Sequence, residues 1–233
     1  MGNTIQVIQR FFSSFRQHSL TSIPAVVRRD AWFAFEAYSS NPPTIHDGFA
    51  LKTNLPDLKV WINPASRQVL FAIRGTDENI LKMRPDADYS DLATDLRLIL
   101  NSEQQTTRYI RAETVVSSYL RNQAYRGYKF IVVGHSLGGS ICYRLADKYH
   151  SLTGNVFNPG VNRDAIRNTA SVSRRIQTHI ISGDPVSGIL GRALGNTIVY
   201  TPFYDPAEQE RFKSLPIQQQ LFKLHSMEAF PRL

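Results

Sequence analysis

The stretch Phe130-Ile131-Val132-Val133-Gly134-His135-Ser136-Leu137-Gly138-Gly139 has the clearest pattern in the chain. The apolar, β-branched run Lys129–Val133 predicts a central strand, and Ser136–His150 predicts the helix after it. Between them lies Gly-x-Ser-x-Gly, whose glycines permit a very tight strand-to-helix turn. Such a turn lifts the serine hydroxyl above the end of the sheet. The segment therefore predicts a nucleophilic serine, Ser136, at the carboxyl end of a strand.

Strands and helices are predicted to alternate along the rest of the chain. The other predicted strands are Phe49–Thr53, Leu58–Asn63, Gln68–Arg74, Gly154–Phe157 and Arg175–Ser182. The other predicted helices are Val26–Tyr38, Asp91–Leu100, Gln104–Gln123 and Lys213–His225. This alternation implies crossover connections and a mostly parallel central sheet flanked by helices. Together with the Gly-x-Ser-x-Gly turn, it predicts an α/β-hydrolase fold. The 233 residues suit one such domain over 26–233, preceded by an N-terminal segment, 1–25.

A serine hydroxyl needs a base, and on this fold the chain order is serine, acid, histidine. Three histidines follow Ser136: His150 ends the nucleophile helix, His179 lies within a predicted strand, and His225 lies near the C-terminus. We therefore expect His225 to be the base.

The acid is expected to be Asp184, because it comes just after the strand-like Ile180-Ile181-Ser182, where open α/β sheets place their sites. Asp205 is the alternative. Asp147 lies about three turns from the serine on the same helix, and Asp164 sits between Arg163 and Arg167 like a solvated charge. The helix after the serine also directs free amides toward a developing oxyanion, and the amide of Leu137 is the expected donor.

Two motifs give the chain a resemblance to the class 3 (fungal-type) lipases. They are Ile73-Arg74-Gly75-Thr76 and the hexapeptide Gly134–Gly139. Further local matches are Asp91–Leu96, Val156–Gly160, Asp184–Val186 and His225-Ser226. The resemblance implies that Thr76 gives the second oxyanion-hole amide and that the substrate is a carboxylic ester of a lipid, either an acylglycerol or a phospholipid. The chain departs from the family at Asn158, where a glycine is usual, and lacks the H-x-G-F element after Leu100.

The family also has a lid, which matches residues 77–90 here. Ile80, Leu81 and Met83 would suit a short apolar flap, whereas the acidic residues around them suit a plain polar loop. Both interpretations stay open.

Net charge is +8, which favours anionic partners such as a phospholipid surface. Residues 4–17 have the spacing of an amphipathic helix, with Phe11, Phe12 and Phe15 on one face. That face would either pack against protein or make peripheral membrane contact. No recognised nucleic-acid motif accompanies the charge, so no nucleic-acid partner is expected.

The sequence contains neither a signal-like segment nor an apolar run of about 20 residues, so a cytoplasmic or membrane-peripheral location is expected. No residue cluster has the ligand spacing of a zinc site, so neither a metal nor an organic cofactor is expected. The oligomeric state is left open.

Two other functions remain beside lipid-ester hydrolysis. One is an esterase or thioesterase for small soluble substrates. The other is a non-catalytic scaffold that binds lipid or protein.

Overall fold

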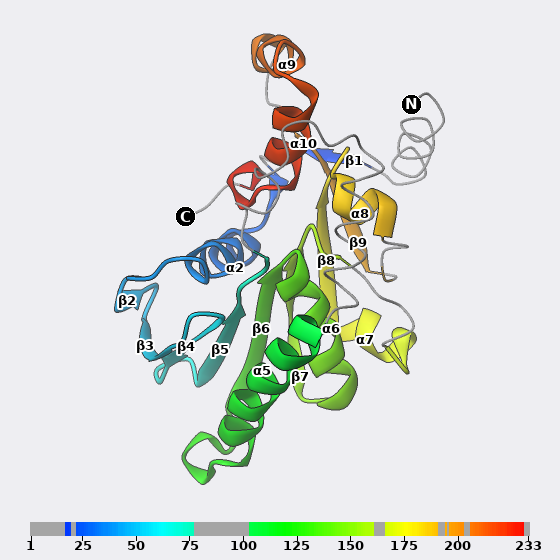
Figure 1. The fold of residues 1–233 in the computed structure, drawn as a ribbon. Coiled ribbons are helices and arrows are strands. Elements are labelled where there is room, and N and C mark those ends of the chain that lie inside the picture. Colours follow the sequence, from blue (N-terminus) through cyan, green and yellow to red (C-terminus); the bar gives the residue numbers. More distant parts are fainter. Residues whose placement is uncertain are drawn as a thin grey trace.

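The computed structural model describes residues 17–19, 22–76, 103–160, 166–190, 194, 196–202 and 206–230. At its centre lies a nine-stranded sheet in the order β1-β9-β8-β7-β6-β5-β4-β3-β2 (Figure 1). The strands are β1 (Gln17–Ser19), β2 (Ile45–His46), β3 (Phe49–Asn54), β4 (Leu58–Asn63), β5 (Gln68–Ile73), β6 (Lys129–His135), β7 (Leu152–Phe157), β8 (Ile176–Ile181) and β9 (Thr197–Thr201). Neighbouring strands are parallel from β1 through β9, β8, β7 and β6 to β5. From β5 through β4 and β3 to β2 they are antiparallel. The predicted mostly parallel sheet is confirmed.

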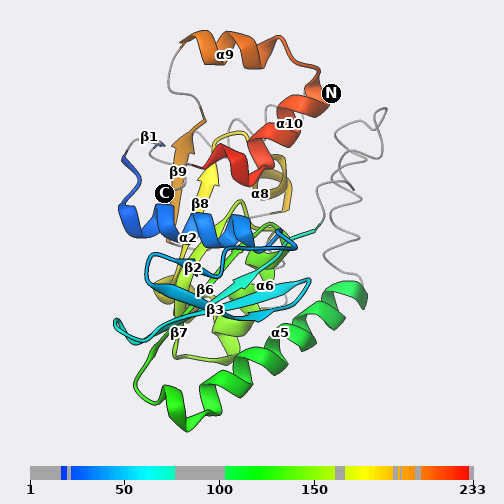
Figure 2. The ribbon, with the colours of Figure 1, turned by 90° about the vertical axis from the view of Figure 1, so that its left-hand side faces the viewer.

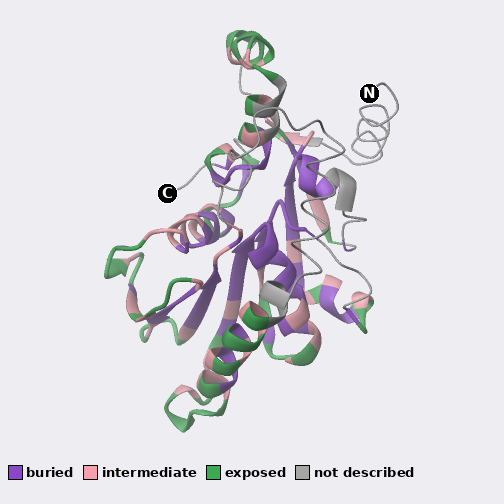
Figure 3. Ribbon diagram, in the orientation of Figure 1, coloured by how far each residue is buried: buried purple, intermediate pink, exposed green. Residues whose placement is uncertain are grey.

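Helices cover both faces of this sheet (Figures 1 and 2). They are α2 (Ala25–Glu36), α5 (Glu103–Arg121), α6 (Leu137–Lys148), α7 (Thr169–Arg175), α8 (Pro185–Leu190), α9 (Pro206–Lys213) and α10 (Ile217–His225), with 3-10 turns η2 (Gln123–Tyr125) and η4 (Met227–Ala229). One core lies between the sheet and α5, α6 and α7, and a second lies between the sheet and α2, α10 and η4. The central strands are buried, whereas most of α9 is not (Figure 3).

Strand β5 belongs to both cores, which explains why its sequence is apolar throughout. Successive side chains of a strand point to opposite faces. Val69 and Phe71 pack in the core with α5 and α6, while Leu70 and Ala72 pack in the core with α2. A strand buried on both faces leaves only its ends for chemistry, and β5 runs directly into the Arg74-Gly75-Thr76 segment.

The C-terminal third differs most from the sequence prediction. The predicted last helix within Lys213–His225 is present, but it starts later: α10 begins at Ile217, and Lys213 is the last residue of α9. Pro216 is the N-cap of α10, and a proline disfavours helical dihedrals in the residue before it, so one continuous helix cannot form. Elements α7, α8, β9 and all of α9 except its last residue were not predicted from the sequence.

The predicted N-terminal helix at 4–17 falls outside the described residues, apart from its last position. That position belongs to β1, an edge strand parallel to β9. The predicted helix Asp91–Leu100 also lies outside the described part. Of the helices that are described, none is both long enough and apolar enough to span a bilayer.

A buried polar chain ties helix α2 to three strands. Asp30 on α2 accepts a hydrogen bond from Asn155 on β7 (2.6 Å). The side-chain oxygen of Asn155 lies 2.8 Å from His179 Nε2, and His179 Nδ1 lies 3.0 Å from the Tyr200 hydroxyl. Burial lowers the pKa of His179 to about 3 and raises the pKa of Asp30. His179 is therefore neutral in the fold at ordinary pH, because a charged imidazole there would lack hydration.

Stability is expected to fall on mild acidification, in part through His179. Below about pH 6.5 the unfolded chain binds a proton on this imidazole, whereas the folded chain does so only near pH 3. Going from pH 7 to pH 5 should therefore lower the free energy of unfolding by about 2 kcal/mol through this residue. Buried His135 should also lower the free energy of unfolding on acidification, because its pKa is lowered too. Asp30 should act in the opposite direction, because its pKa is raised.

Urea unfolding of the wild type and His179→Gln at both pH values checks this. Between pH 7 and pH 5, the free energy of unfolding of the variant should fall by about 2 kcal/mol less than that of the wild type. Equal losses in both proteins would contradict the assignment of a neutral buried imidazole at this position.

Candidate active site

Ser136 occupies a sharp turn between β6 and α6. Its backbone dihedrals are φ 54° and ψ −124°, a conformation that non-glycine residues rarely adopt. The turn brings α6 against the end of β5: a Cβ on Gly138 would lie 2.1 Å from the carbonyl oxygen of Ile73. Only glycine fits there, which explains the second glycine of the motif. The strain is held by the packed strand and helix on either side.

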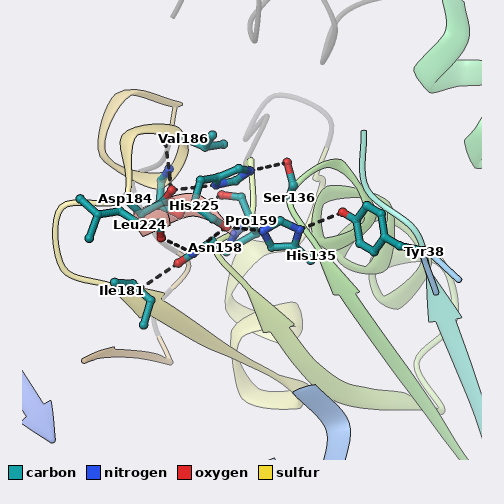
Figure 4. Close-up of polar contacts among 11 residues, drawn as sticks. Tyr38, His135, Ser136, Asn158, Pro159, Ile181, Asp184, Val186, Leu224 and His225 are labelled. Atoms are coloured by element: carbon teal, nitrogen blue, oxygen red, sulfur yellow. Dashed lines mark hydrogen bonds and ion pairs between the residues drawn. The ribbon is translucent and has the colours of Figure 1, made fainter. Parts of the chain in front are cut away.

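Three side chains that are far apart in sequence meet at the carboxyl end of the sheet (Figure 4). The Ser136 Oγ lies 3.0 Å from His225 Nε2, and His225 Nδ1 lies 2.7 Å from Asp184 Oδ1. All three are buried, with exposed fractions of 5%, 3% and 0% in the order Ser136, His225, Asp184. Because a carboxylate only accepts, Nδ1 carries the proton toward Asp184 and Nε2 is free to accept the serine proton.

Asp184 is held by the start of helix α8. Its Oδ2 accepts a hydrogen bond from the amide of Ser187 (2.8 Å), and its Oδ1 accepts one from the amide of Val186 (3.4 Å). Gly183, with φ 91°, makes the turn that leads from β8 into this position. Free amides at a helix start stabilise a carboxylate, so the fold provides for a buried charge at Asp184.

The backbone of His225 is fixed by two side chains from the sheet. Its carbonyl oxygen accepts hydrogen bonds from His135 Nε2 (2.6 Å) and from Asn158 Nδ2 (3.1 Å). Since a carbonyl can only accept, His135 must carry its proton on Nε2. Burial, and then the neighbouring His225, lower the pKa of His135 well below its usual range, so it stays neutral. Both contacts anchor the last turn of α10, to the end of β6 and to the residue after β7.

Asn158, where the resemblance to class 3 lipases leads us to expect a glycine, has a structural role. Its φ is 40°, a left-handed conformation that asparagine tolerates better than most residues. Its amide group donates to the carbonyl oxygens of Leu224 and His225 and accepts from the amide of Ile181. A glycine would adopt the same backbone but would make none of these bonds. The asparagine joins β8, which leads to Asp184, to the His225 segment.

Tyr38 links the Gly75 loop to His135, although no sequence pattern marked it as a site residue. Its hydroxyl lies 2.8 Å from His135 Nδ1 and accepts the backbone amide of Gly75 (3.1 Å). With His135 protonated on Nε2, the hydroxyl donates to Nδ1. One chain of hydrogen bonds thus runs from Gly75 through Tyr38 and His135 to the backbone of His225. Figure 4 shows the Tyr38–His135 contact within it.

The residues expected to give the two oxyanion donors, Leu137 and Thr76, both lie in segments next to Ser136. Leu137 is the first residue of α6, where backbone amides have no partner within the helix. Thr76 follows Gly75, and a Cβ on Gly75 would lie 3.1 Å from the Cβ of Ser136. Leu137 is thus next to Ser136 in the chain, and Thr76 follows a residue whose backbone packs against the Ser136 side chain.

The other candidate residues are engaged elsewhere or not described. His179 bonds to Asn155 and Tyr200 in the core, and His150 lies exposed beyond the end of α6. Asp147 accepts the amides of Arg167 and Asn168. The alternative acid Asp205, Asp164 and the lid region 77–90 lie outside the described residues.

Three features together define an α/β-hydrolase fold. They are the mostly parallel sheet, the strained serine between β6 and α6, and a histidine from the C-terminal region at the carboxyl ends of the strands. Among solved structures, the chain is similar to Lip2 lipase of Yarrowia lipolytica, with 13% identity over 73% of this chain and 76% of that one, and a TM-score of 0.47.

Two further fungal proteins show a similar level of likeness. Lipase II of Rhizopus niveus has 15% identity, coverage of 81% of this chain and 76% of that one, and a TM-score of 0.47. The triacylglycerol lipase of Penicillium expansum has 13% identity, coverage of 80% and 82%, and a TM-score of 0.46. No protein-family model matches the chain, and no curated protein sequence matches it.

Proposed function

We propose that this protein is a serine hydrolase that cleaves carboxylic esters of lipids. The observation that supports this most strongly is the continuous hydrogen-bonded series from Asp184 through His225 to Ser136, set at a strained strand-to-helix turn. A serine, an imidazole and a buried carboxylate in this order form the apparatus of nucleophilic acyl transfer. An inert serine would need neither the strain nor the oriented base.

The reaction would proceed in two halves. His225 Nε2 takes the Ser136 hydroxyl proton as Oγ attacks the ester carbonyl carbon, and Asp184 stabilises the imidazolium. The carbonyl oxygen becomes an oxyanion that accepts from the amides of Leu137 and Thr76. The imidazolium then gives its proton to the leaving alcohol, which leaves an acyl-enzyme. Water, deprotonated by the same histidine, attacks the acyl-enzyme and releases the carboxylic acid and free Ser136.

Lipid esters are favoured over soluble ones by the resemblance of two separate motifs, Ile73–Thr76 and Gly134–Gly139, to class 3 lipases. The net charge of +8 is consistent with attraction to an anionic lipid surface. The distinction between acylglycerol and phospholipid is left to experiment.

A hydrolysis panel tests this proposal. Purified protein and Ser136→Ala are assayed on triacylglycerol emulsions, phospholipid vesicles and soluble esters of increasing acyl length. We expect Ser136-dependent release of fatty acid, with long-chain lipid esters preferred. A preference for short soluble esters would support the small-ester alternative. No difference from Ser136→Ala on any substrate would support a non-catalytic scaffold.

A further inference from the structure

The segment that carries the expected oxyanion donor Thr76 is held by an arginine from a different part of the fold. Arg108 lies on α5, which packs beside β5 and α6 (Figures 1 and 2). Its Nη2 donates to the carbonyl oxygens of Arg74 and, at 3.1 Å, of Gly75. These two carbonyls belong to the residues directly before Thr76.

We propose that Arg108 is a positioning residue for the oxyanion hole: it fixes the Gly75–Thr76 peptide so that the Thr76 amide is ready to bind the oxyanion. The inference rests on the proposed function of Ser136 and adds to it a residue that the triad does not include.

The first step of the argument is the geometry of one peptide unit. The carbonyl of Gly75 and the amide of Thr76 share a planar trans peptide, so the two groups point in opposite directions. A guanidinium bound to the carbonyl therefore holds the amide pointing away from α5. It also draws electron density from the amide, and hydrogen bonds in such a series strengthen one another.

The second step is that the same loop is held from the opposite side. The amide of Gly75 donates to the Tyr38 hydroxyl, and Gly75 packs so closely on the nucleophile turn that an added Cβ would lie 2.6 Å from the His135 carbonyl oxygen. The Arg74–Gly75 peptide is thus bound at both its carbonyl and its amide, and the next peptide, Gly75–Thr76, is bound at its carbonyl. The Gly75–Thr76 peptide therefore has little freedom to rotate. A preorganised donor costs no rearrangement when the oxyanion forms.

The third step is that this cation has an unfavourable environment. Desolvation lowers the pKa of Arg108, and the nearby cations Arg74 and Arg111 act in the same direction, while Asp57 acts against them. A neutral side chain would avoid both costs. Features that lower stability locally are expected where function requires them, and a positive charge behind an oxyanion donor matches the charge that develops in the transition state.

The test compares Arg108→Gln and Arg108→Lys with the control Arg111→Gln. Arg111 lies one turn further along α5, is 65% exposed and pairs with Asp57 at 3.5 Å. The measurements are kcat and KM on a soluble ester, with kcat expressed per serine that a fluorophosphonate labels at end point. Binding of a boronic acid, which mimics the tetrahedral intermediate, is compared with binding of an ether analogue that has no carbonyl oxygen.

We expect Arg108→Gln to lower kcat about tenfold, less than the 10²- to 10³-fold loss on removing an oxyanion donor itself. KM should stay within about twofold, because the interaction forms mainly in the transition state. Boronic acid affinity should fall in parallel with kcat, ether affinity should not change, and Arg108→Lys should recover part of both losses. Arg111→Gln should match the wild type.

Two results overturn the inference while leaving the proposed function intact. One is that the wild type is active and Arg108→Gln has the same kcat and the same affinity for the boronic acid. The other is a variant with a lower melting temperature and fewer labelled serines but unchanged kcat per labelled serine, which would mean that Arg108 only stabilises the fold. A wild type that neither hydrolyses esters nor reacts with the fluorophosphonate overturns the proposed function, and the inference with it.

Discussion

Replacing His225 by alanine is expected to reduce kcat for ester hydrolysis by roughly 10⁴- to 10⁶-fold. The reason is the position of its imidazole, with Nε2 3.0 Å from the Ser136 Oγ and Nδ1 2.7 Å from Asp184. Without it, no described side chain accepts the serine proton, and a neutral hydroxyl is a poor nucleophile. The remaining rate would come from substrate binding and the oxyanion hole.

The comparison is made by steady-state kinetics on the best ester of the panel, with His150→Ala as control. His150 follows Ser136 in the sequence as His225 does, but it is exposed and lies past the end of α6. The control should keep the wild-type rate. A His225→Ala variant that retained more than a few per cent of kcat would rule out His225 as the base.

Asp184→Asn is expected to lower kcat by about 10⁴-fold although it changes only one atom. The amide of Ser187 donates to Oδ2, so an asparagine must keep its oxygen there and turn its NH₂ toward His225 Nδ1. An NH₂ group donates, which forces the imidazole proton onto Nε2. That nitrogen would then point a proton at the serine and could no longer accept one.

Asp30→Asn is the matched control, because Asp30 is also a buried aspartate that bonds to side chains of the fold. It should change stability but keep kcat within about threefold of the wild type, since it has no contact with the site. If both asparagine variants lost activity to the same extent, the effect of Asp184→Asn would be one of stability and not of histidine orientation.

The strained turn at Ser136 was predictable from sequence because its determinants are local. An apolar strand, two glycines around a serine, and an apolar helix follow one another in the sequence. The structure has each of them as expected: β6, the turn at Ser136, and α6. The roles of Ser136, Asp184 and His225 in catalysis stay predictions, although their side chains lie within hydrogen-bond distance of one another.

The supporting residues could not be predicted, because their roles depend on distant parts of the chain. Tyr38 lies just after α2 and yet contacts His135, and Arg108 on α5 contacts the loop that follows β5 at Gly75. Nothing in the local pattern of either residue indicates a partner. Asn158 alone carried a signal, as a departure from a glycine in a class 3 lipase motif, and its positive φ gives the physical reason.

Helix boundaries near the C-terminus were predicted less well for a related reason. The apolar spacing of Lys213–His225 suits a helix, but Pro216 requires the chain to change direction inside it. The break allows α10 to run on its own axis toward α8, and its last residue, His225, then lies beside Asp184. A local pattern of hydrophobic residues cannot show this change of direction.

The central claim is that the Ser136 hydroxyl is activated by His225, and covalent labelling tests it most directly. The purified chain is treated with a fluorophosphonate, digested, and analysed by mass spectrometry, alongside Ser136→Ala and His225→Ala. We predict one adduct, on Ser136, which is absent from Ser136→Ala and forms far more slowly in His225→Ala. No adduct on the wild-type serine, or equal labelling of all three proteins, would contradict the account.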